Sequence, residues 1–215
     1  MISPKKNILL VHSSNDLYGA SKIFLQLIDL FISEGFNVHV VLPETGKLDN
    51  FLNKKDIKVS YHELGVLRKK YLNPFGLMNR LVTNIKAIKF ISDYINDNSI
   101  NLVYTNTSTI LSGGIAAKKN GIPCIFHIHE IPTGNKLYEF LSGKIINWYS
   151  SKVLTVSNSV EKHWLKYIDD KKIERIYNGI VFKKTDPIIK LDRGQDDFVI
   201  TSVARIIPYK GHGYL

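Results

Sequence analysis

The sequence predicts an α/β protein built on a doubly wound, mostly parallel sheet, and three observations lead to this prediction. Short apolar runs typical of buried strands alternate along the chain with segments whose apolar residues recur at helical spacing. In the opening unit, residues 7–31, a strand-like run is followed at once by a loop and a helical stripe. Turn signals separate the segments, with Pro43 after one strand and Gly121 after one helix. Such alternation places parallel strands between two layers of helices.

The individual elements follow from the same patterns. Strands are expected at residues 7–12, 37–42, 58–61, 101–105, 124–129, 153–156 and 175–177. Helices are expected at 23–31, 48–54, 77–95, 110–120, 138–149 and 160–167. In the long helix, Lys86 and Phe90 are expected opposite an apolar stripe that packs on the sheet. The stripe consists of Leu77, Leu81, Ile85, Ile88, Ile91 and Ile95.

Composition limits the class of protein. With 215 residues, 44% hydrophobic and 22% charged, the chain has ample material for a core and is not of a disordered type. A single cysteine, Cys124, excludes an internal disulfide framework and fits a reducing compartment. The basic start, residues 1–6, carries no secretory signal, and no apolar segment has the length of a membrane span. These features predict a cytoplasmic protein.

The net charge of +10 is concentrated in one acid-free segment, residues 64–92. Because anionic lipid attracts such basic segments, the cluster predicts docking on the inner face of a membrane. Solvated lysines beside a helix that packs on the sheet are the open alternative. A nucleic-acid partner is disfavoured because no binding motif accompanies the charge. The basic residues are Arg68, Lys69, Lys70, Arg80, Lys86 and Lys89.

The first loop is a candidate ligand site. It lies at the carboxyl end of the first strand, where open α/β sheets bind ligands, and Gly19-Ala20 stands at the start of the following helix. Glycine lets the backbone approach a ligand closely, although a plain structural turn explains one glycine equally well.

Five short motifs occur in order along most of the chain: Tyr18-Gly19-Ala20, Pro123 followed by His129, Val156-Ser157, residues 177–180 and residues 203–212. Taken together in this order, they resemble the retaining glycosyltransferases of the GT-B fold, in the large family 4 group. Residues 203–212 look like the opening of that family's second domain, which typically reads Gly-Arg-Leu-x-Pro-x-Lys-Gly. Residues 177–180, Tyr-Asn-Gly-Ile, resemble the crossover between its domains. Val156-Ser157 resembles the family's Val-Ser turn, and His129 after Pro123 resembles its His-ending strand. Tyr18-Gly19-Ala20 resembles its Gly-Gly-Ala loop.

The resemblance implies a fold and a division of the chain. Residues 1–181 would be the Rossmann-like, acceptor-side domain that forms the N-terminal half of a GT-B fold. Residues 182–197 would be a linker, and 198–215 the first strand and phosphate loop of a donor domain. The strand at 198–203 is expected to be buried.

The resemblance also assigns roles to single residues. Arg205 and Lys210 would contact the donor diphosphate, and His129 the donor sugar or the reacting centre. Glu130 would orient a ring or bind a hydroxyl group. The remaining predicted cleft and acceptor residues are Gly19, Ala20, Ser157, Asn178 and Gly179.

Three departures from the family pattern limit this assignment. Tyr18 stands in place of a glycine, and Val181 or Phe182 in place of an aspartate. The family's Glu-x7-Glu carboxylates near the donor sugar are absent from these 215 residues. The chain alone is therefore predicted to be catalytically inactive.

No metal or other cofactor is predicted. Asp169-Asp170 and Asp196-Asp197 are adjacent pairs without the spacing of a metal site. The run His127-x-His129-Glu130 raises the question of zinc, but no third strong ligand is evident nearby.

The predicted function is transfer of a sugar, with retention, from a nucleotide-sugar donor to a glycan or lipid-linked acceptor in polysaccharide or cell-surface glycan synthesis. Two alternatives stay open: a nucleotide-sugar epimerase of similar architecture, and a non-catalytic acceptor-binding or membrane-docking subunit. A dinucleotide oxidoreductase is disfavoured because no Gly-x-Gly-x-x-Gly follows the first strand. The sequence does not indicate whether the protein is a monomer or an oligomer.

Overall fold

The computed structural model describes residues 5–55, 57–66, 71, 73–132, 136–180, 194, 198–204, 206 and 211–214. In this part of the chain, parallel strands form a sheet in the order β3-β2-β1-β4-β5-β6-β7. This confirms the predicted α/β class. The strands are β1 (Asn7–Val11), β2 (Asn37–Leu42), β3 (Lys58–Tyr61), β4 (Ile100–Thr105), β5 (Cys124–Ile128), β6 (Lys152–Thr155) and β7 (Ile173–Arg175).

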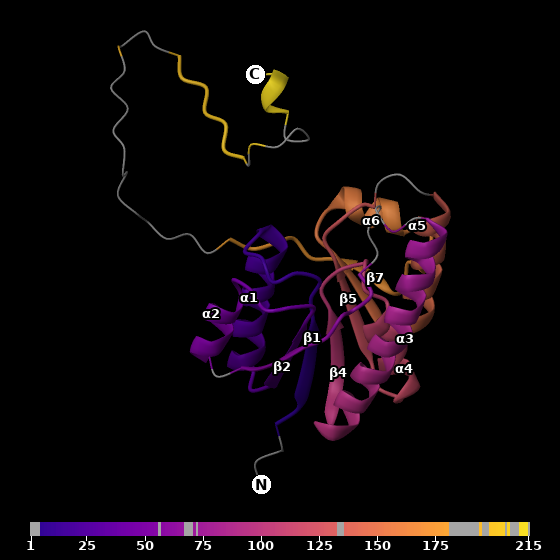
Figure 1. The fold of residues 1–215 in the computed structure, drawn as a ribbon. Helices are drawn as coiled ribbons and strands as arrows, with labels where there is room; N and C mark the ends of the chain where they lie inside the picture. Colours follow the sequence, from indigo (N-terminus) through magenta and orange to yellow (C-terminus); the bar gives the residue numbers. More distant parts are fainter. Residues whose placement is uncertain are drawn as a thin grey trace. The chain divides into compact units, whose positions relative to one another are not determined.

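Helices cover both faces of the sheet, with α1 and α2 on one side and α3, α4 and α5 on the other (Figure 1). Alternation within the strands produces the two layers, since Ile8 and Leu10 face α1 while Leu9 and Val11 face α3 and α4. The helices are α1 (Gly19–Ser33), α2 (Asp49–Leu52), α3 (Pro74–Asp97), α4 (Ser112–Lys119), α5 (Lys136–Tyr149) and α6 (Asn158–Trp164), with short 3-10 turns η1 (Asn53–Lys55) and η4 (His212–Tyr214).

The order of the strands reverses direction between β1 and β4. From β1 the chain proceeds outward to β2 and β3, then returns to place β4 on the other side of β1. Loops at the carboxyl ends of two such strands diverge to opposite faces of the sheet, which leaves room for a ligand between them. The side chains that follow β1, β4 and β5 therefore decide the chemistry of this edge.

Helix α3 begins at Pro74, three residues before the predicted start at Leu77, because the Asn73 side chain accepts a hydrogen bond from the Gly76 N–H at 2.8 Å and Pro74 follows this cap. The predicted apolar stripe is wrong over its first half: Leu81 is 57% exposed and Ile85 is 59% exposed. A helix of 24 residues is about 36 Å long, whereas strands of 5–6 residues span about 20 Å. The helix therefore extends past the sheet, and its second half supplies the buried residues Ala87, Ile91, Tyr94 and Ile95.

The predicted position of Phe90, opposite the apolar stripe, is also wrong. Instead of lying opposite the core, its ring stacks on the His62 ring, with 4.4 Å between centroids, and packs against buried residues. Lys86 is exposed, as expected.

Strand β7 lies earlier than the predicted range 175–177. It pairs with β6 in the register Val153 to Ile173, and beyond the strand the Ile176 N–H donates to the Thr155 carbonyl at 2.8 Å. The pairing register, rather than local composition, sets where this edge strand begins.

The chain divides into two compact units, Met1–Gly179 and Ile180–Leu215. In the second unit, residues 198–203 form no strand and Phe198 and Val203 are exposed, so the buried strand expected there is not formed. A strand is stabilised only by pairing with a neighbour and by a covered face. The assignment of 198–215 to a second domain stays a prediction.

Candidate functional site

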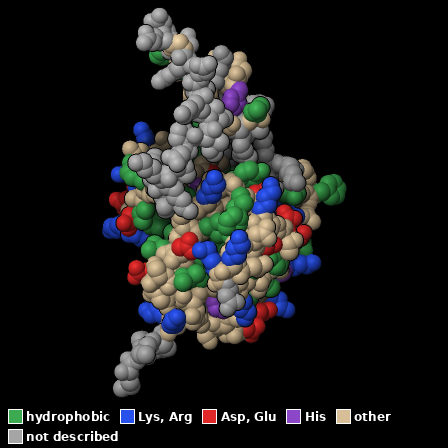
Figure 2. Space-filling view, turned by 90° about the vertical axis from the view of Figure 1, so that its left-hand side faces the viewer, with side chains coloured by type: hydrophobic (Ala, Val, Ile, Leu, Met, Phe, Trp, Pro, Cys, Tyr) green, Lys and Arg blue, Asp and Glu red, His purple; other side chains and the backbone are tan. Residues whose placement is uncertain are grey.

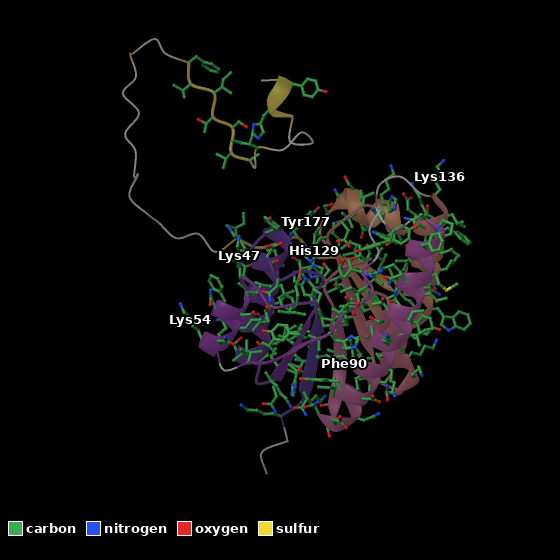
Figure 3. The ribbon with its side chains drawn as sticks, in the orientation of Figure 1. Lys47, Lys54, Phe90, His129, Lys136 and Tyr177 are labelled. Carbon is green, nitrogen blue, oxygen red and sulfur yellow. The ribbon has the colours of Figure 1, made fainter. Side chains whose placement is uncertain are left out.

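Polar side chains gather where β1, β4 and β5 end. His12 follows β1, Asn106 follows β4 and His129 follows β5. In Figure 3 His129 lies at the end of the sheet opposite the N-terminus. Because these strands are neighbours in a parallel sheet, their carboxyl ends bring the three side chains together at the point where the strand order reverses.

A chain of hydrogen bonds joins these residues. His129 Nε2 lies 2.9 Å from Asn106 Oδ1, and Asn106 Nδ2 lies 3.1 Å from His12 Nδ1. The His12 Nε2 atom is 3.0 Å from the hydroxyl of Ser21 in α1. His12, Asn106 and Ser21 are almost fully buried, while His129 is partly exposed. The network therefore connects the interior of the first βα unit to an imidazole that a ligand can reach.

Burial keeps these imidazoles neutral. It lowers the pKa of His12 to about 4, with a further contribution from nearby His129. Burial also lowers the pKa of His129, although the neighbouring Glu130 carboxylate opposes the effect. At neutral pH both rings thus have one N–H donor and one acceptor nitrogen.

His127 lies beneath His129 on the same face of β5, with 4.2 Å between ring centroids. Its Nδ1 atom is 2.9 Å from the Tyr104 hydroxyl, and its Nε2 atom is buried without a hydrogen-bond partner in the described structure. Burial, with a smaller contribution from His129, lowers the pKa of His127 to about 3. His127 is therefore a packed ring that supports His129 rather than one that faces a ligand.

The Glu130 carboxylate holds the loop after β4. Oε1 accepts hydrogen bonds from the Thr107 hydroxyl at 2.7 Å, the Ser108 N–H at 2.7 Å and the Ser108 hydroxyl at 2.8 Å, while Oε2 accepts from the His129 N–H at 3.2 Å. Its backbone carbonyl accepts from Nε1 of buried Trp164 at 3.2 Å. The carboxylate thus fixes the ends of β4 and β5 to each other and does not contact the His129 ring.

The other predicted cleft residues lie in several places. Gly19 is the exposed first residue of α1, and the Ala20 carbonyl lies 3.5 Å from Asn106 Nδ2. Ser157 caps α6, its hydroxyl accepting from the Val160 N–H at 3.3 Å. Asn178 and Gly179 are exposed at the end of the first unit. The structure brings Ala20 to the network; the ligand-binding roles of these residues stay predictions.

Five predicted residues lie outside the described residues: Arg205 and Lys210 of the donor site, and Arg68, Lys69 and Lys70 of the basic segment.

Most of the residues that contact His129 and Glu130, directly or through the network, were not predicted from the sequence: His12, Ser21, Asn106, Thr107 and Ser108. A signal was present, because His12 and Asn106 each come directly after a buried strand. Applying the carboxyl-end rule to the last residue of the predicted strand 7–12 and to the residue after the strand 101–105 would have found both.

Within the described ranges, no three His, Cys, Asp or Glu side chains are grouped so that they could hold a metal ion. The helices of that same part of the chain include none that is long and apolar enough to cross a membrane.

A parallel sheet with buried and half-buried polar side chains at the carboxyl edge beside the strand reversal defines a Rossmann-like ligand-binding domain. The particular family follows from its sequence. The chain belongs to Glycosyltransferase Family 4, whose profile matches residues 18–183. This confirms the resemblance read from the motifs.

Individual relatives agree with the family. The chain is 23% identical over 220 residues to the UDP-Gal:alpha-D-GlcNAc-diphosphoundecaprenol alpha-1,3-galactosyltransferase of Escherichia coli, covering 92% of this chain and 53% of that protein. It superposes on a glycosyltransferase from Rickettsia africae ESF-5 with a TM-score of 0.63 and 22% identity, covering 82% of this chain and 44% of the other. For Anabaena HepE, solved with UDP and glucose, the TM-score is 0.61, the identity 20% and the coverage 80% and 44%. The fold is the N-terminal half of a GT-B glycosyltransferase, and the chain spans about half the length of these relatives.

Proposed function

We propose that this chain is the acceptor-side half of a retaining glycosyltransferase, which moves a hexose from a nucleotide-sugar donor to a glycan or lipid-linked acceptor in cell-surface polysaccharide synthesis. The observation that carries the proposal is the position of His129. In a chain of Glycosyltransferase Family 4, its partly exposed ring stands at the strand reversal and is held there by Asn106. The Escherichia coli relative is named as a transferase from UDP-Gal to a lipid diphosphate-linked sugar, which supports the class of donor and acceptor.

The chemistry places separate demands on the two halves of such an enzyme. Breaking the bond between sugar and diphosphate builds negative charge on the leaving group and positive charge at the anomeric carbon. In the proposal Arg205 and Lys210 contact the diphosphate, and no metal or other cofactor takes part. Because the pKa of His129 is lowered, its imidazole is neutral at pH 7, and a neutral imidazole forms hydrogen bonds with hydroxyl groups. In the proposal His129 therefore binds a sugar hydroxyl near the reacting centre.

The test uses the protein extended to the length of its relatives. It is incubated with a panel of UDP-, GDP-, ADP- and TDP-hexoses, with and without diphosphate-lipid acceptors that end in a sugar. Release of nucleoside diphosphate that requires acceptor, with the anomeric configuration retained in the product, is the expected result. Arg205→Ala and Lys210→Ala should each weaken donor use about ten- to hundredfold, because each removes a charge-assisted contact worth about 1.5–3 kcal/mol.

Other outcomes identify the alternatives. Acceptor-independent conversion of the donor to its epimer would mean an epimerase. Binding of acceptor lipid without consumption of any donor would mean a non-catalytic subunit. Turnover of a nucleotide sugar by residues 1–215 alone would contradict the proposal that catalysis also requires the donor-side half.

We further propose that the enzyme works on an anionic membrane surface, docking through the α3 apolar face and the basic residues around it. We define this face as the exposed apolar residues in the first half of α3: Phe75, Leu77, Met78, Leu81, Val82 and Ile85. Phe75 is 89% exposed, and Lys86 and Lys89 are exposed close by. The segment 64–92 has no acidic residue, which suits anionic lipid rather than a protein partner of mixed charge. On the side covered by α1 and α2, by contrast, basic and acidic side chains are interspersed (Figure 2).

Vesicle sedimentation tests the docking surface. Phosphatidylglycerol vesicles should bind the protein, and binding should fall with salt, with Lys86→Glu and with alanine substitution of Arg68, Lys69 and Lys70. Lys54→Glu in η1 is the matched control and should leave binding unchanged. Equal binding to phosphatidylcholine vesicles, or binding to neither, would overturn the proposal, and self-association through the same face would show as a concentration-dependent dimer.

A further inference from the structure

The Asn106 side-chain amide lies between the imidazoles of His12 and His129, and its two ends have different hydrogen-bonding properties. One end of the group donates hydrogen bonds and the other accepts them, so its orientation decides which nitrogen of each neighbouring ring carries the proton. Two arrangements satisfy both rings equally: one leaves the Nδ1 atom of His129 as a hydrogen-bond acceptor for a ligand, and the other leaves the same atom as a donor.

A third contact distinguishes the two arrangements. The backbone carbonyl of Ala20, in the first turn of α1, lies 3.5 Å from Asn106 Nδ2. A carbonyl oxygen only accepts hydrogen bonds, so the amine end of the amide belongs on the side of Ala20 and His12. The reverse orientation would direct two oxygen lone pairs at each other in a buried site, which is unfavourable.

From this orientation we infer that Asn106 is a positioning residue that imposes one tautomer on His12 and on His129. The Asn106 amine donates to His12 Nδ1, at 3.1 Å, so His12 carries its proton on Nε2 and donates it to the Ser21 hydroxyl, at 3.0 Å. Asn106 Oδ1 accepts from His129 Nε2, at 2.9 Å. His129 therefore holds its proton on Nε2, and its Nδ1 atom is an acceptor.

The surroundings of His129 are consistent with this assignment. Oε1 of Glu130 is occupied by Thr107 and Ser108, and Oε2 accepts from the backbone of His129, so the carboxylate does not draw the ring proton to Nδ1. Burial favours the neutral ring, which is the form that a single tautomer requires.

The consequence rests on the proposed function and refines it. An acceptor nitrogen pairs with a hydroxyl group of a sugar, whereas it repels a phosphate oxygen. His129 in this tautomer therefore selects the sugar part of a ligand and leaves the diphosphate to cationic groups. Asn106 acts on the ligand only through His129.

Long-range ¹H–¹⁵N NMR correlation of the imidazoles in the 215-residue chain measures both tautomers directly and requires no activity. We expect Nε2–H for both His12 and His129 at pH 7.5. Nδ1–H in His129 would overturn the inference, whatever the enzyme proves to do.

Variants at Asn106 sharpen the test. Asn106→Asp puts an acceptor at both ends of the side chain, so His12 should change to the Nδ1–H form while His129 keeps Nε2–H. Asn106→Leu, of similar volume, should leave His129 as a mixture of tautomers. Asn147→Asp is the control, because Asn147 Oδ1 accepts from the Asp169 N–H at 3.1 Å and lies before β6, at the other end of the sheet. Unchanged tautomers in both Asn106 variants would contradict the positioning role.

Activity then separates this inference from the proposed function. In the extended protein, Asn106→Asp should retain more turnover than Asn106→Leu, because the aspartate preserves the bond to His129 Nε2. If the tautomers change as expected while turnover is absent in the unmodified protein as well, the positioning role stands and the transferase proposal fails.

Discussion

Replacing Glu130 with alanine should destabilise the site more than its partly exposed position suggests. The side chain accepts four hydrogen bonds, three of them at 2.7–2.8 Å from the Thr107–Ser108 loop and one from the His129 backbone. A bond to a charged acceptor contributes about 1.5–3 kcal/mol when measured alone, but bonds to one group are not additive and water can replace some of them. We therefore expect the free energy of unfolding to fall by about 3 kcal/mol, or roughly 6–12 °C in Tm for a chain of this size.

Urea denaturation followed by circular dichroism and by tryptophan fluorescence measures this loss, since buried Trp164 donates to the Glu130 carbonyl. Glu130→Gln keeps an acceptor for the loop but presents an amine to the His129 N–H, and should lose only about 1 kcal/mol. Glu34→Ala, at an exposed carboxylate after α1, is the control and should change stability by less than about 0.5 kcal/mol. A Glu130→Ala protein as stable as the Glu34 control would refute the role of the carboxylate as the clamp between β4 and β5.

Three further predictions concern packing, protonation and the two histidines of β5. Gly114→Ala should lower the free energy of unfolding by about 1–3 kcal/mol, because the new Cβ would lie 2.6 Å from Phe126 Cε2. Gly19→Ala is the control and should be neutral or stabilising, since a Cβ there would have no atom within 4 Å. Thermal unfolding compares the two variants, and equal effects would contradict the close approach of α4 to the sheet. The pKa of His12 is lowered from 6.5 to about 4, so between these pH values the imidazole is protonated in the unfolded chain but neutral in the folded chain. The free energy of unfolding should therefore fall by up to about 1.4 kcal/mol per pH unit as the pH decreases through this range. His12→Gln should flatten that slope by about one proton, and an unchanged slope would argue against a neutral buried ring. In the extended protein, His129→Ala should lower turnover more than His127→Ala, because the His127 ring is buried against Tyr104; equal kinetic effects would show that the reacting ring has been misassigned.

Much of the fold could be predicted from the sequence because its signals are local. Strands β2 and β3 occupy the predicted residues, and the opening unit folds as a strand, loop and helix in the predicted order. Apolar periodicity and turn residues act over a few positions and are visible in the chain itself. Helix α3 shows where such signals end, since the periodicity of Leu81 and Ile85 cannot reveal that the sheet is shorter than the helix.

The site was predictable only in part, for the same reason. His129 and Glu130 could be selected from their place after an apolar run and from a family resemblance. Their partners His12 and Asn106 also follow buried strands, but they are distant in sequence, and no local pattern shows that these two side chains meet.

The α/β class, the family and the strand ends at which a ligand would bind could be predicted from the chain alone, because short patterns of apolar, turn and motif residues indicate each of them. The contacts by which Asn106 joins His12 to His129, and Glu130 holds a loop instead of a ring, became visible only in the folded protein. Such contacts arise when parallel strands separated by many residues bring their carboxyl ends side by side, and the direction of one buried amide then depends on a single carbonyl, that of Ala20, across the site.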